Sequence, residues 1–285
     1  MNAQKRRAQR AIDAAVKVAK AHNIYVNRPT VISDLYGMRV LLDPAPIVAR
    51  VSTLTAILRQ PIHNWLSREI DVATYLGNAG FPVVPPSKVV PPGPYVESGF
   101  GISFWTYAKS NSEKLVSNSV FCSMLNDLHK ALKEYTGELP ILAPIYNDIP
   151  SGISRLEVLG DVVPISDLNF LKAIWHQVQQ RIDATSADVQ PIHGDSHAGN
   201  ILLTEAGPLW NDFEDVCIGP IEWDWSCSAV DSSLIAGVNQ EQLKFFQFAR
   251  LLHATVWGHA LLKETPQYSV QIRALLDQLK EQHQY

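Results

Sequence analysis

The chain is poor in cysteine, and its three cysteines follow no spacing typical of a cross-link or a metal site. Cys122, Cys217 and Cys227 form no CxxC pair and no Cys/His pattern. An odd number of such thiols fits neither a disulfide framework nor a structural zinc site. We therefore expect reduced thiols, as in a cytoplasmic protein.

The chain also lacks a strong excess of charge and any long apolar run. It has 24 Lys and Arg against 28 Asp and Glu, a net charge of -4 over 285 residues. Without a broad basic surface, neither nucleic acid nor a membrane is the expected partner. Residues 11–21 follow a basic start but include Asp13, Lys17 and Lys20, so they do not resemble a secretion signal. No apolar run reaches the length of a membrane span, and the sequence predicts a globular protein of enzyme size.

Hydrophobic periodicity divides the chain into a strand-rich part and a helical part. The first part is predicted to hold a helix at 3–22, three antiparallel strands within 30–53, a helix at 64–78, and strands at 83, 95–97 and 102–107. A polar stretch at 109–114 ends this pattern. Helices are then predicted at 117–135, 168–184, 240–262 and 270–282, with Pro-rich connections at 140–150 and 162–164 and a short β element within 191–213. We expect an α+β fold with two lobes, residues 1–108 and 109–285.

One segment, PIHGDSHAGNILLTEAGPLWNDFED at 191–215, carries most of the chemistry-bearing residues. Its apolar runs at 201–204 and 209–212, joined by a turn with Gly207 and Pro208, predict a β-hairpin. Such a hairpin places Asn200 beside Asp212 at its open end, and Asp195 can face the same spot from a glycine-containing loop. Oxygen ligands of this kind suit Mg²⁺. A metal near the phosphates and a carboxylate near the attacking hydroxyl are what phosphoryl transfer requires.

The spacing H-G-D-x-x-x-x-N-I-L followed by D-F-E resembles the aminoglycoside phosphotransferase family, whose fold is similar to that of protein kinases. Further matches are MLNDLHKAL at 124–132 and GPIEWDWS at 219–226, so the resemblance covers roughly residues 30–260. It implies a nucleotide-binding N-terminal lobe at 1–108 and a catalytic, substrate-binding C-terminal lobe at 109–285. Asp195 would be the catalytic aspartate, with Asn200 and Asp212 as Mg²⁺ ligands. ATP or GTP would be the co-substrate, and a hydroxyl of a small molecule the acceptor.

The resemblance also requires a cation for the phosphates and a helix carboxylate that holds it. Val48 and Arg50 point to one face of their predicted strand, and Glu69 lies on the following helix. Here the chain departs from the kinase pattern, because Arg50 stands where lysine is usual and the preceding loop, SDLYG, has one glycine. Arginine is still a permanent phosphate ligand. By the same resemblance, backbone groups of Thr106 and Ala108 would bind the purine.

Other polar residues of the motif region have structural interpretations. We expect His193 to organise its loop and His129 to pack or cap a helix. Asp224 is interpreted as the N-cap of a helix that starts near Trp225. Glu214 belongs either to the metal site or to a solvated turn.

The distribution of charge gives a hypothesis about the acceptor. Residues 182–243 include no Lys or Arg but eleven Asp and Glu. If these carboxylates cluster, they would favour a cationic acceptor such as an amino sugar or an amino alcohol.

Two other functions compete with a kinase. A metal-dependent hydrolase would use His193, Asp195 and His197, which alternate as an HxDxH segment on one face of a predicted strand. A catalytically silent kinase-like protein would bind a nucleotide without turnover, in keeping with Arg50 and the glycine-poor loop.

Overall fold

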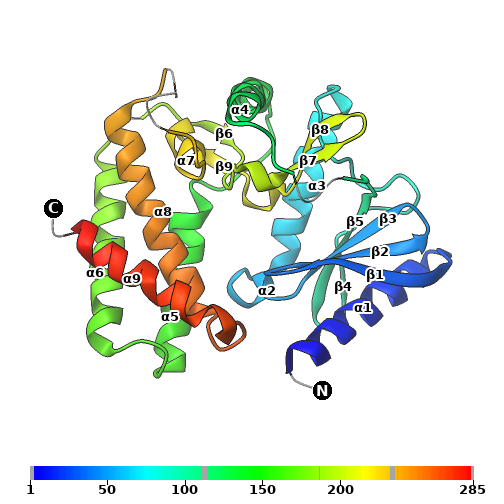
Figure 1. Ribbon diagram of the computed structural model, residues 1–285, viewed down its shortest axis with the longest axis horizontal. Helices are drawn as coiled ribbons and strands as arrows, with labels where there is room; N and C mark the ends of the chain where they lie inside the picture. Colours follow the sequence, from blue (N-terminus) through cyan, green and yellow to red (C-terminus); the bar gives the residue numbers. More distant parts are fainter. Residues whose placement is uncertain (1–2, 111–113, 186, 232–234, 236, 284–285) are drawn as a thin grey trace. The chain divides into compact units, whose positions relative to one another are not determined.

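The computed structural model of the protein describes residues 3–110, 114–185, 187–231, 235 and 237–283 (Figure 1). The chain forms two compact units, Met1–Val120 with Ala198–Glu214, and Phe121–His197 with Asp215–Tyr285. The first unit is rich in strands and the second is mainly helical, which confirms the predicted α+β class. Residues 198–214 fold with the first unit, although their sequence position placed them in the second lobe. Residues 111–113 of the predicted lobe boundary lie outside the described residues.

A five-stranded antiparallel sheet is the centre of the first unit, in the order β1-β2-β3-β5-β4. Its strands are β1 (Val26–Asp34), β2 (Met38–Pro44), β3 (Ile47–Ser52), β4 (Tyr95–Glu97) and β5 (Phe100–Thr106). The three strands expected within 30–53 are therefore present. The strand expected at Val83 is reduced to an isolated bridge with Trp210.

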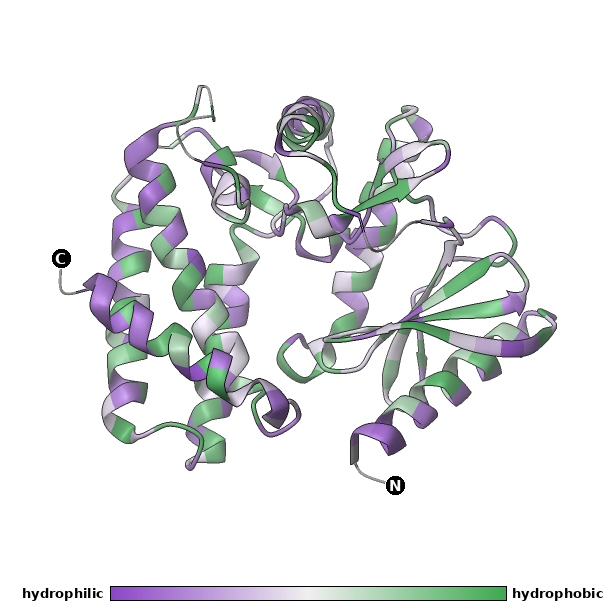
Figure 2. Cartoon of the chain, viewed as in Figure 1, coloured by the Kyte–Doolittle hydropathy of each residue, from purple (hydrophilic) through white to green (hydrophobic). Residues whose placement is uncertain are grey.

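One face of this sheet forms a core with helix α1 (Ala3–Ala21). Because side chains alternate along a strand, Met38, Val40 and Leu42 of β2 all point to the same face. They are buried with the alanines of α1, whose small side chains let the helix lie close to the sheet. Figure 2 shows hydrophobic and polar residues alternating along α1, as expected for a helix that buries one side.

The other face of β2 and β3 carries the polar side chains. Arg39 pairs directly with Arg50 across the two strands, and Leu41 pairs with Val48. Helices α2 (Thr55–Leu58) and α3 (Ile62–Asn78) follow, and α3 buries an apolar stripe that includes Leu66, Ile70 and Ala73. Gly101 of β5 makes room for this helix, since a Cβ there would lie 2.9 Å from Ile62 Cγ2.

The predicted hairpin is present, with strands β7 (Ile201–Thr204) and β8 (Gly207–Trp210). The second strand begins and ends two residues earlier than expected, because the turn is shorter. Asp212 therefore follows the strand instead of ending it. Its φ of 68° is in the left-handed region, which aspartate adopts more readily than most residues.

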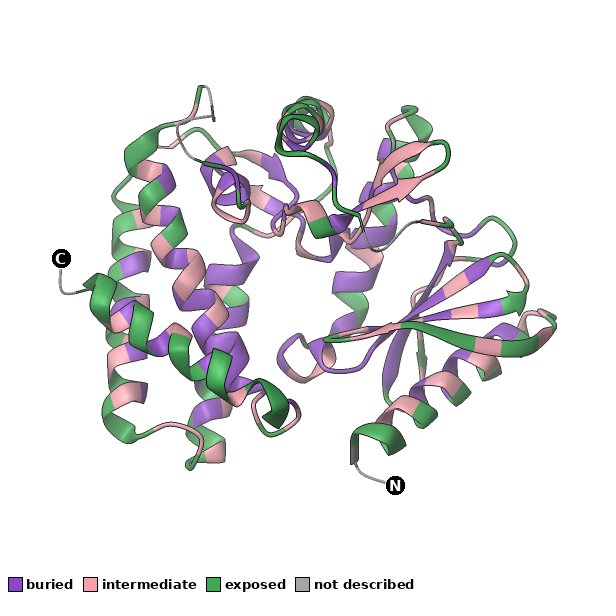
Figure 3. Cartoon of the chain, in the orientation of Figure 1, coloured by how far each residue is buried: buried purple, intermediate pink, exposed green. Residues whose placement is uncertain are grey.

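Helix α8 (Gln240–Ala260) is the centre of the second unit and packs against α5, α6, α7 and α9. The remaining helices and strands are α4 (Asn118–Lys133), α5 (Ile149–Leu159), α6 (Ile165–Asp183), β6 (Gln190–Ile192), β9 (Cys217–Gly219), α7 (Ile221–Ser226) and α9 (Ser269–His283). The C-terminal half of α8 is almost wholly buried, whereas α9 is exposed over most of its length (Figure 3). Gly152 of α5 allows the close approach of α8, since a Cβ there would lie 2.5 Å from Val256 Cγ1.

Two helices differ from the sequence prediction. Helix α5 overlaps the expected Pro-rich connection at 140–150 only in its first two residues, and the rest of it lies where no element was predicted. Helix α7 begins at Ile221, not near Trp225, so Asp224 is inside it and is not its N-cap.

Candidate active site

Arg50 is the centre of an ion-pair network within the first unit. It lies on β3 with only 11% of its side chain exposed, and it pairs with Glu69 of α3, as predicted. Its Nη2 also lies 2.6 Å from Asp212 Oδ1 and pairs with Glu214. Three carboxylates thus surround one guanidinium.

Burial and charge act in opposite directions on this network. Burial raises the pKa of Glu69 to about 8, and the neighbouring carboxylates Asp212 and Glu214 act in the same direction, although the attraction of Arg50 lowers it. Burial works to lower the pKa of Arg50, but the attraction of Asp212, Glu69 and Glu214 outweighs it, so this pKa is raised. Arg50 therefore keeps its charge in the interior.

Glu214 also pairs with a second arginine. Arg59 Nη1 lies 2.7 Å from Glu214 Oε1, and both side chains are at most 5% exposed. The Arg59 guanidinium also stacks over Trp65 of α3, 4.5 Å from the ring centroid. Of the two sequence interpretations of Glu214, the solvated turn is wrong, because the residue is buried in ion pairs.

The end of the hairpin brings Asn200 and Asp212 to the same cavity. Beyond β8, the Asn211 backbone N–H donates to the Asn200 carbonyl at 2.9 Å, and Asn211 Nδ2 donates to the same oxygen at 2.8 Å. Asp212 is the next residue. Both Asn200 and Asp212 line a cavity of about 440 Å³ in the first unit.

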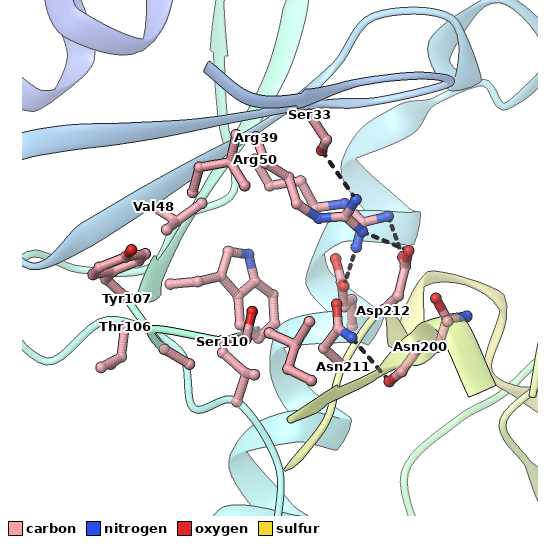
Figure 4. Close-up of a pocket in the computed structure, with 17 residues that line it drawn as sticks. Ser33, Arg39, Val48, Arg50, Thr106, Tyr107, Ser110, Asn200, Asn211 and Asp212 are labelled. Atoms are coloured by element: carbon pink, nitrogen blue, oxygen red, sulfur yellow. Dashed lines mark hydrogen bonds and ion pairs between the residues drawn. The ribbon is translucent and has the colours of Figure 1, made fainter. Parts of the chain in front are cut away.

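Figure 4 shows this cavity, into which Arg39, Arg50 and Asp212 point toward one another. Arg39 was missed by sequence analysis, and its Nη2 lies 2.6 Å from Asp212 Oδ2. Val48, Thr106 and Ala108, predicted from the resemblance, also line the cavity, as do Val84 and Leu202.

The backbone of the predicted purine site has a defined pattern of hydrogen bonds. The Thr106 N–H donates to the Pro85 carbonyl at 3.0 Å, and the Tyr107 N–H donates to the Pro46 carbonyl at 2.9 Å. These bonds fix the course of the chain after β5. The Thr106 N–H is already used by the Pro85 carbonyl, so a contact of Thr106 with a purine would fall to its carbonyl, and this contact stays a prediction.

The donor set of the cavity fits a hard cation. Asp212 and Asn200 offer a carboxylate and an amide oxygen, the ligand types that Mg²⁺ takes together with water and phosphate. Oε2 of Glu69 is buried and has no hydrogen-bond partner among the described residues, so the cavity wall also holds an unsatisfied acceptor.

Asp195 lies in the second unit, in the loop that follows β6. The Asp224 carboxylate holds this loop, because Oδ2 accepts from the His193 N–H at 2.9 Å and Oδ1 accepts from the Gly194 N–H at 2.8 Å. His129 Nε2 lies 2.9 Å from the same Oδ2. Asp224 is thus a loop-fixing residue of α7, fully buried, which the N-cap interpretation had missed.

The Asp195 carboxylate has two basic neighbours. Arg250 of α8 forms an ion pair with Oδ1, and His197 Nε2 lies 3.6 Å from Oδ2. The Arg250 guanidinium also lies over the ring of Trp223, 5.5 Å from its centroid. The meeting of Asp195 with Asn200 and Asp212 around one metal ion stays a prediction, because Asp195 belongs to the other unit.

The geometry of a zinc hydrolase is not found. Strand β6 ends at Ile192, so His193, Asp195 and His197 lie in a loop and do not alternate along a strand face. The buried His193 instead accepts the Asp195 N–H through Nδ1 at 3.3 Å, in keeping with the predicted loop-organising role. Within the described ranges, no group of three or more His, Cys, Asp or Glu could hold a metal ion.

Four of the acidic residues of 182–243 lie in structural contacts. Asp224 and Glu214 are buried in the pairs described above, Glu222 accepts the Asn239 N–H, and Asp183 accepts the Tyr146 hydroxyl. The charge pattern therefore does not by itself indicate a negatively charged acceptor site.

The strand-rich first unit and the helical second unit are those of a kinase-like fold. The sequence model of the phosphotransferase enzyme family matches residues 63–251, which is most of the chain. The chain belongs to the phosphotransferase enzyme family, as the motif resemblance had indicated. It is accordingly a small-molecule kinase that acts on a hydroxyl group.

Several solved structures with similar folds are kinases of small molecules. An amicoumacin kinase in complex with AMP-PNP, Ca²⁺ and Ami has a TM-score of 0.64 at 12% identity, with 97% of this chain and 96% of that chain covered. The choline kinase LicA from Streptococcus pneumoniae has a TM-score of 0.63 at 14% identity, with coverage of 93% and 98%. A GDP complex of aminoglycoside 2'-phosphotransferase-IIIa has a TM-score of 0.63 at 14% identity, with coverage of 96% and 99%. No curated protein matches the sequence. Among the described helices, none is long and apolar enough to cross a membrane.

Proposed function

We propose that the chain transfers the γ-phosphoryl group of ATP or GTP, bound with Mg²⁺, to a hydroxyl of a small molecule. The observation that carries the proposal is the network of Arg50, Glu69 and Asp212 on the wall of one cavity. It combines a permanent cation, a glutamate side chain that orients this cation, and an oxygen that can bind a metal ion. These are the parts that phosphoryl transfer requires.

The nucleotide would lie with its base against β5 and its phosphates toward Arg50. Val48, Val84 and Leu202 offer apolar surface to the base. The Thr106 carbonyl accepts a hydrogen bond from it, and the Ala108 N–H donates one. Adenine and guanine each carry a hydrogen-bond donor and an acceptor that can meet this carbonyl and this N–H. The similar structures include complexes of both AMP-PNP and GDP.

The phosphate end is organised by the chain's own ion pairs. Glu69 and Glu214 hold the Arg50 guanidinium, which binds the phosphates. Asp212 and Asn200 would hold Mg²⁺, which when bound neutralises charge on the phosphates.

Asp195 is the proposed catalytic base. The acceptor hydroxyl oxygen bonds to the γ-phosphorus while the bond from this phosphorus to the bridging oxygen breaks. The nucleoside diphosphate leaves with the electron pair, and the hydroxyl proton passes to the Asp195 carboxylate. Arg250 and His197 orient that carboxylate.

The acceptor class we propose is an amino alcohol, an amino sugar or an aminoglycoside. Support comes from the names of the similar structures, which include a choline kinase and an aminoglycoside phosphotransferase. A cationic acceptor would also be attracted to the Asp195 carboxylate, whose side chain is 27% exposed.

The test is consumption of Mg-ATP and Mg-GTP with a panel of amino alcohols, aminoglycosides and neutral sugars. Asp195→Ala should lower turnover by about 10² to 10⁴-fold, the usual effect of a positioned general base, with nucleotide affinity near that of the wild type. Asp188→Ala, which removes an exposed carboxylate from the segment before β6, is the matched control and should keep turnover.

Two outcomes would contradict the proposal. Unchanged turnover in Asp195→Ala would remove the catalytic role of that residue. Wild-type protein that binds Mg-nucleotide but transfers phosphate to none of the acceptors would instead favour the catalytically silent alternative.

A further inference from the structure

Arg39 occupies an unusual position in the sheet of the first unit. It lies on β2 directly opposite Arg50 on β3, and both side chains point away from the core with α1 and into the cavity. Like charges directly opposite each other on paired strands are destabilising. A pair of arginines at this place therefore requires an anion between them.

In the structure, that anion is Asp212. Its Oδ1 lies 2.6 Å from Arg50 Nη2, and its Oδ2 lies 2.6 Å from Arg39 Nη2. Both carboxylate oxygens thus face a guanidinium. If Asp212 is the metal ligand of the proposed function, at least one oxygen has to exchange its arginine for the metal.

Of the two arginines, Arg39 can be released from Asp212 at the smaller cost in free energy. Arg50 is 11% exposed and is held besides by the buried Glu69 and Glu214. Arg39 is 31% exposed, and its hydrogen bond to the Ser33 hydroxyl is long, at 3.4 Å. Freed from Asp212, its guanidinium would still lie on the cavity wall.

The loop between β1 and β2 indicates what the released arginine would bind. In kinases a glycine-rich loop donates backbone N–H groups to the phosphates. Here the loop has one glycine, and its Leu35 N–H already donates to the Gly37 carbonyl at 3.3 Å. An arginine side chain, with its fork of donors, can supply phosphate contacts in place of such a backbone.

We propose that Arg39 is an exchangeable counterion of the site. It covers the Asp212 carboxylate before the nucleotide binds, and it turns to the triphosphate when Asp212 takes up the metal. This inference rests on the proposed function, in which Asp212 is a metal ligand.

The exchange predicts opposite effects on two affinities when Arg39 is replaced. In Arg39→Gln, free Mn²⁺ measured by electron paramagnetic resonance without nucleotide should bind severalfold more tightly, because Asp212 is uncovered. The affinity for Mg-AMP-PNP, measured by calorimetry, should fall about ten- to hundredfold, the value of a lost charge-assisted hydrogen bond. In Arg39→Lys, which keeps the charge, both affinities should lie between those of the wild type and those of Arg39→Gln. Arg28→Gln, at an exposed arginine of β1, is the matched control and should change neither.

The results for Arg39→Gln and Asp212→Asn together distinguish this inference from the proposed function. If Arg39→Gln leaves both affinities unchanged, or weakens both, the exchange is refuted. Asp212→Asn tests the proposed function by itself, and it should lose Mn²⁺ and Mg-AMP-PNP affinity. Loss in Asp212→Asn with no effect in Arg39→Gln would overturn only the inference, whereas unchanged affinities in Asp212→Asn would overturn both.

Discussion

Glu69 shows how a single side chain couples the stability of the protein to its site. It is buried beside Arg50, yet one of its oxygens has no hydrogen-bond partner among the described residues. Burial therefore raises the pKa of Glu69 to about 8, from an ordinary value of 4.5. At pH values between these two, the folded protein binds a proton that the unfolded chain has released.

The sign of the resulting pH dependence follows from this difference. Because the folded state binds more protons in this range, the contribution of Glu69 to the free energy of unfolding falls as the pH rises from about 4.5 to about 8. We expect Glu69→Gln to remove this contribution, since the amide does not titrate. Denaturant unfolding of both proteins at several pH values between 5 and 8 measures the effect. A difference between the two proteins that stays constant across this range would contradict it.

At the scale of elements, the loop that carries Asp195 depends on a close backbone approach. Gly194 has a φ of 86°, and a Cβ there would lie 2.0 Å from the Asp215 carbonyl oxygen. Its N–H donates to Asp224, and its carbonyl accepts from Trp223 Nε1 at 2.7 Å. Any side chain at this position has to displace the backbone that follows the DFE segment.

Gly194→Ala should therefore destabilise the second unit and lower turnover. Gly160→Ala is the matched control, because Gly160 also has a positive φ, 68°, but no atom lies within 4 Å of a Cβ there. The free energy of unfolding of the control should fall only by the cost of a left-handed alanine, about 1–2 kcal/mol, and its activity should be kept. In Gly194→Ala the free energy of unfolding should fall by at least twice that amount. Thermal unfolding measures both variants, and equal losses would show that the close approach is unimportant.

The elements that sequence predicted best are those with a regular hydrophobic period. The short β-branched runs of β2 and β3 indicated the sheet, and the family resemblance paired Glu69 of α3 with Arg50. Helix α5 was missed because Pro150 was taken as a sign of a connection, although proline suits the first turn of a helix. The periodic Ile149, Ile153 and Leu156 were the signal that could have identified it.

The missed residues of the site share one property, which is distance along the chain. Arg39 and Asp212 are separated by 173 positions, and Arg59 and Glu214 by 155. Local periodicity carries no information about such pairs. The motif identified Asp195, Asn200 and Asp212 as candidates, but Arg39 and Arg250, which pair with two of them, could be found only from the folded chain.

At the scale of the whole molecule, the two units hold different parts of the proposed machinery. The first unit contains the cavity with Arg50, Asn200 and Asp212, and the second contains Asp195 with Arg250. The family match at residues 63–251 extends over both units. Nucleotide binding and the catalytic step should therefore be separable by mutation.

Hydrogen exchange can measure this separation. Mg-AMP-PNP at about 100 times its dissociation constant stabilises the state that binds it by about 2.7 kcal/mol, so amides that exchange through opening of that state should be protected. We expect this protection in β2, β3, β5 and the hairpin β7-β8, and little change in α6 and α9. Asp212→Ala should lose most of the protection, because the metal ligand is gone, whereas Asp195→Ala should keep it. Protection found mainly in α6 and α9, or loss of protection in both variants alike, would contradict the assignment of the nucleotide to the first unit.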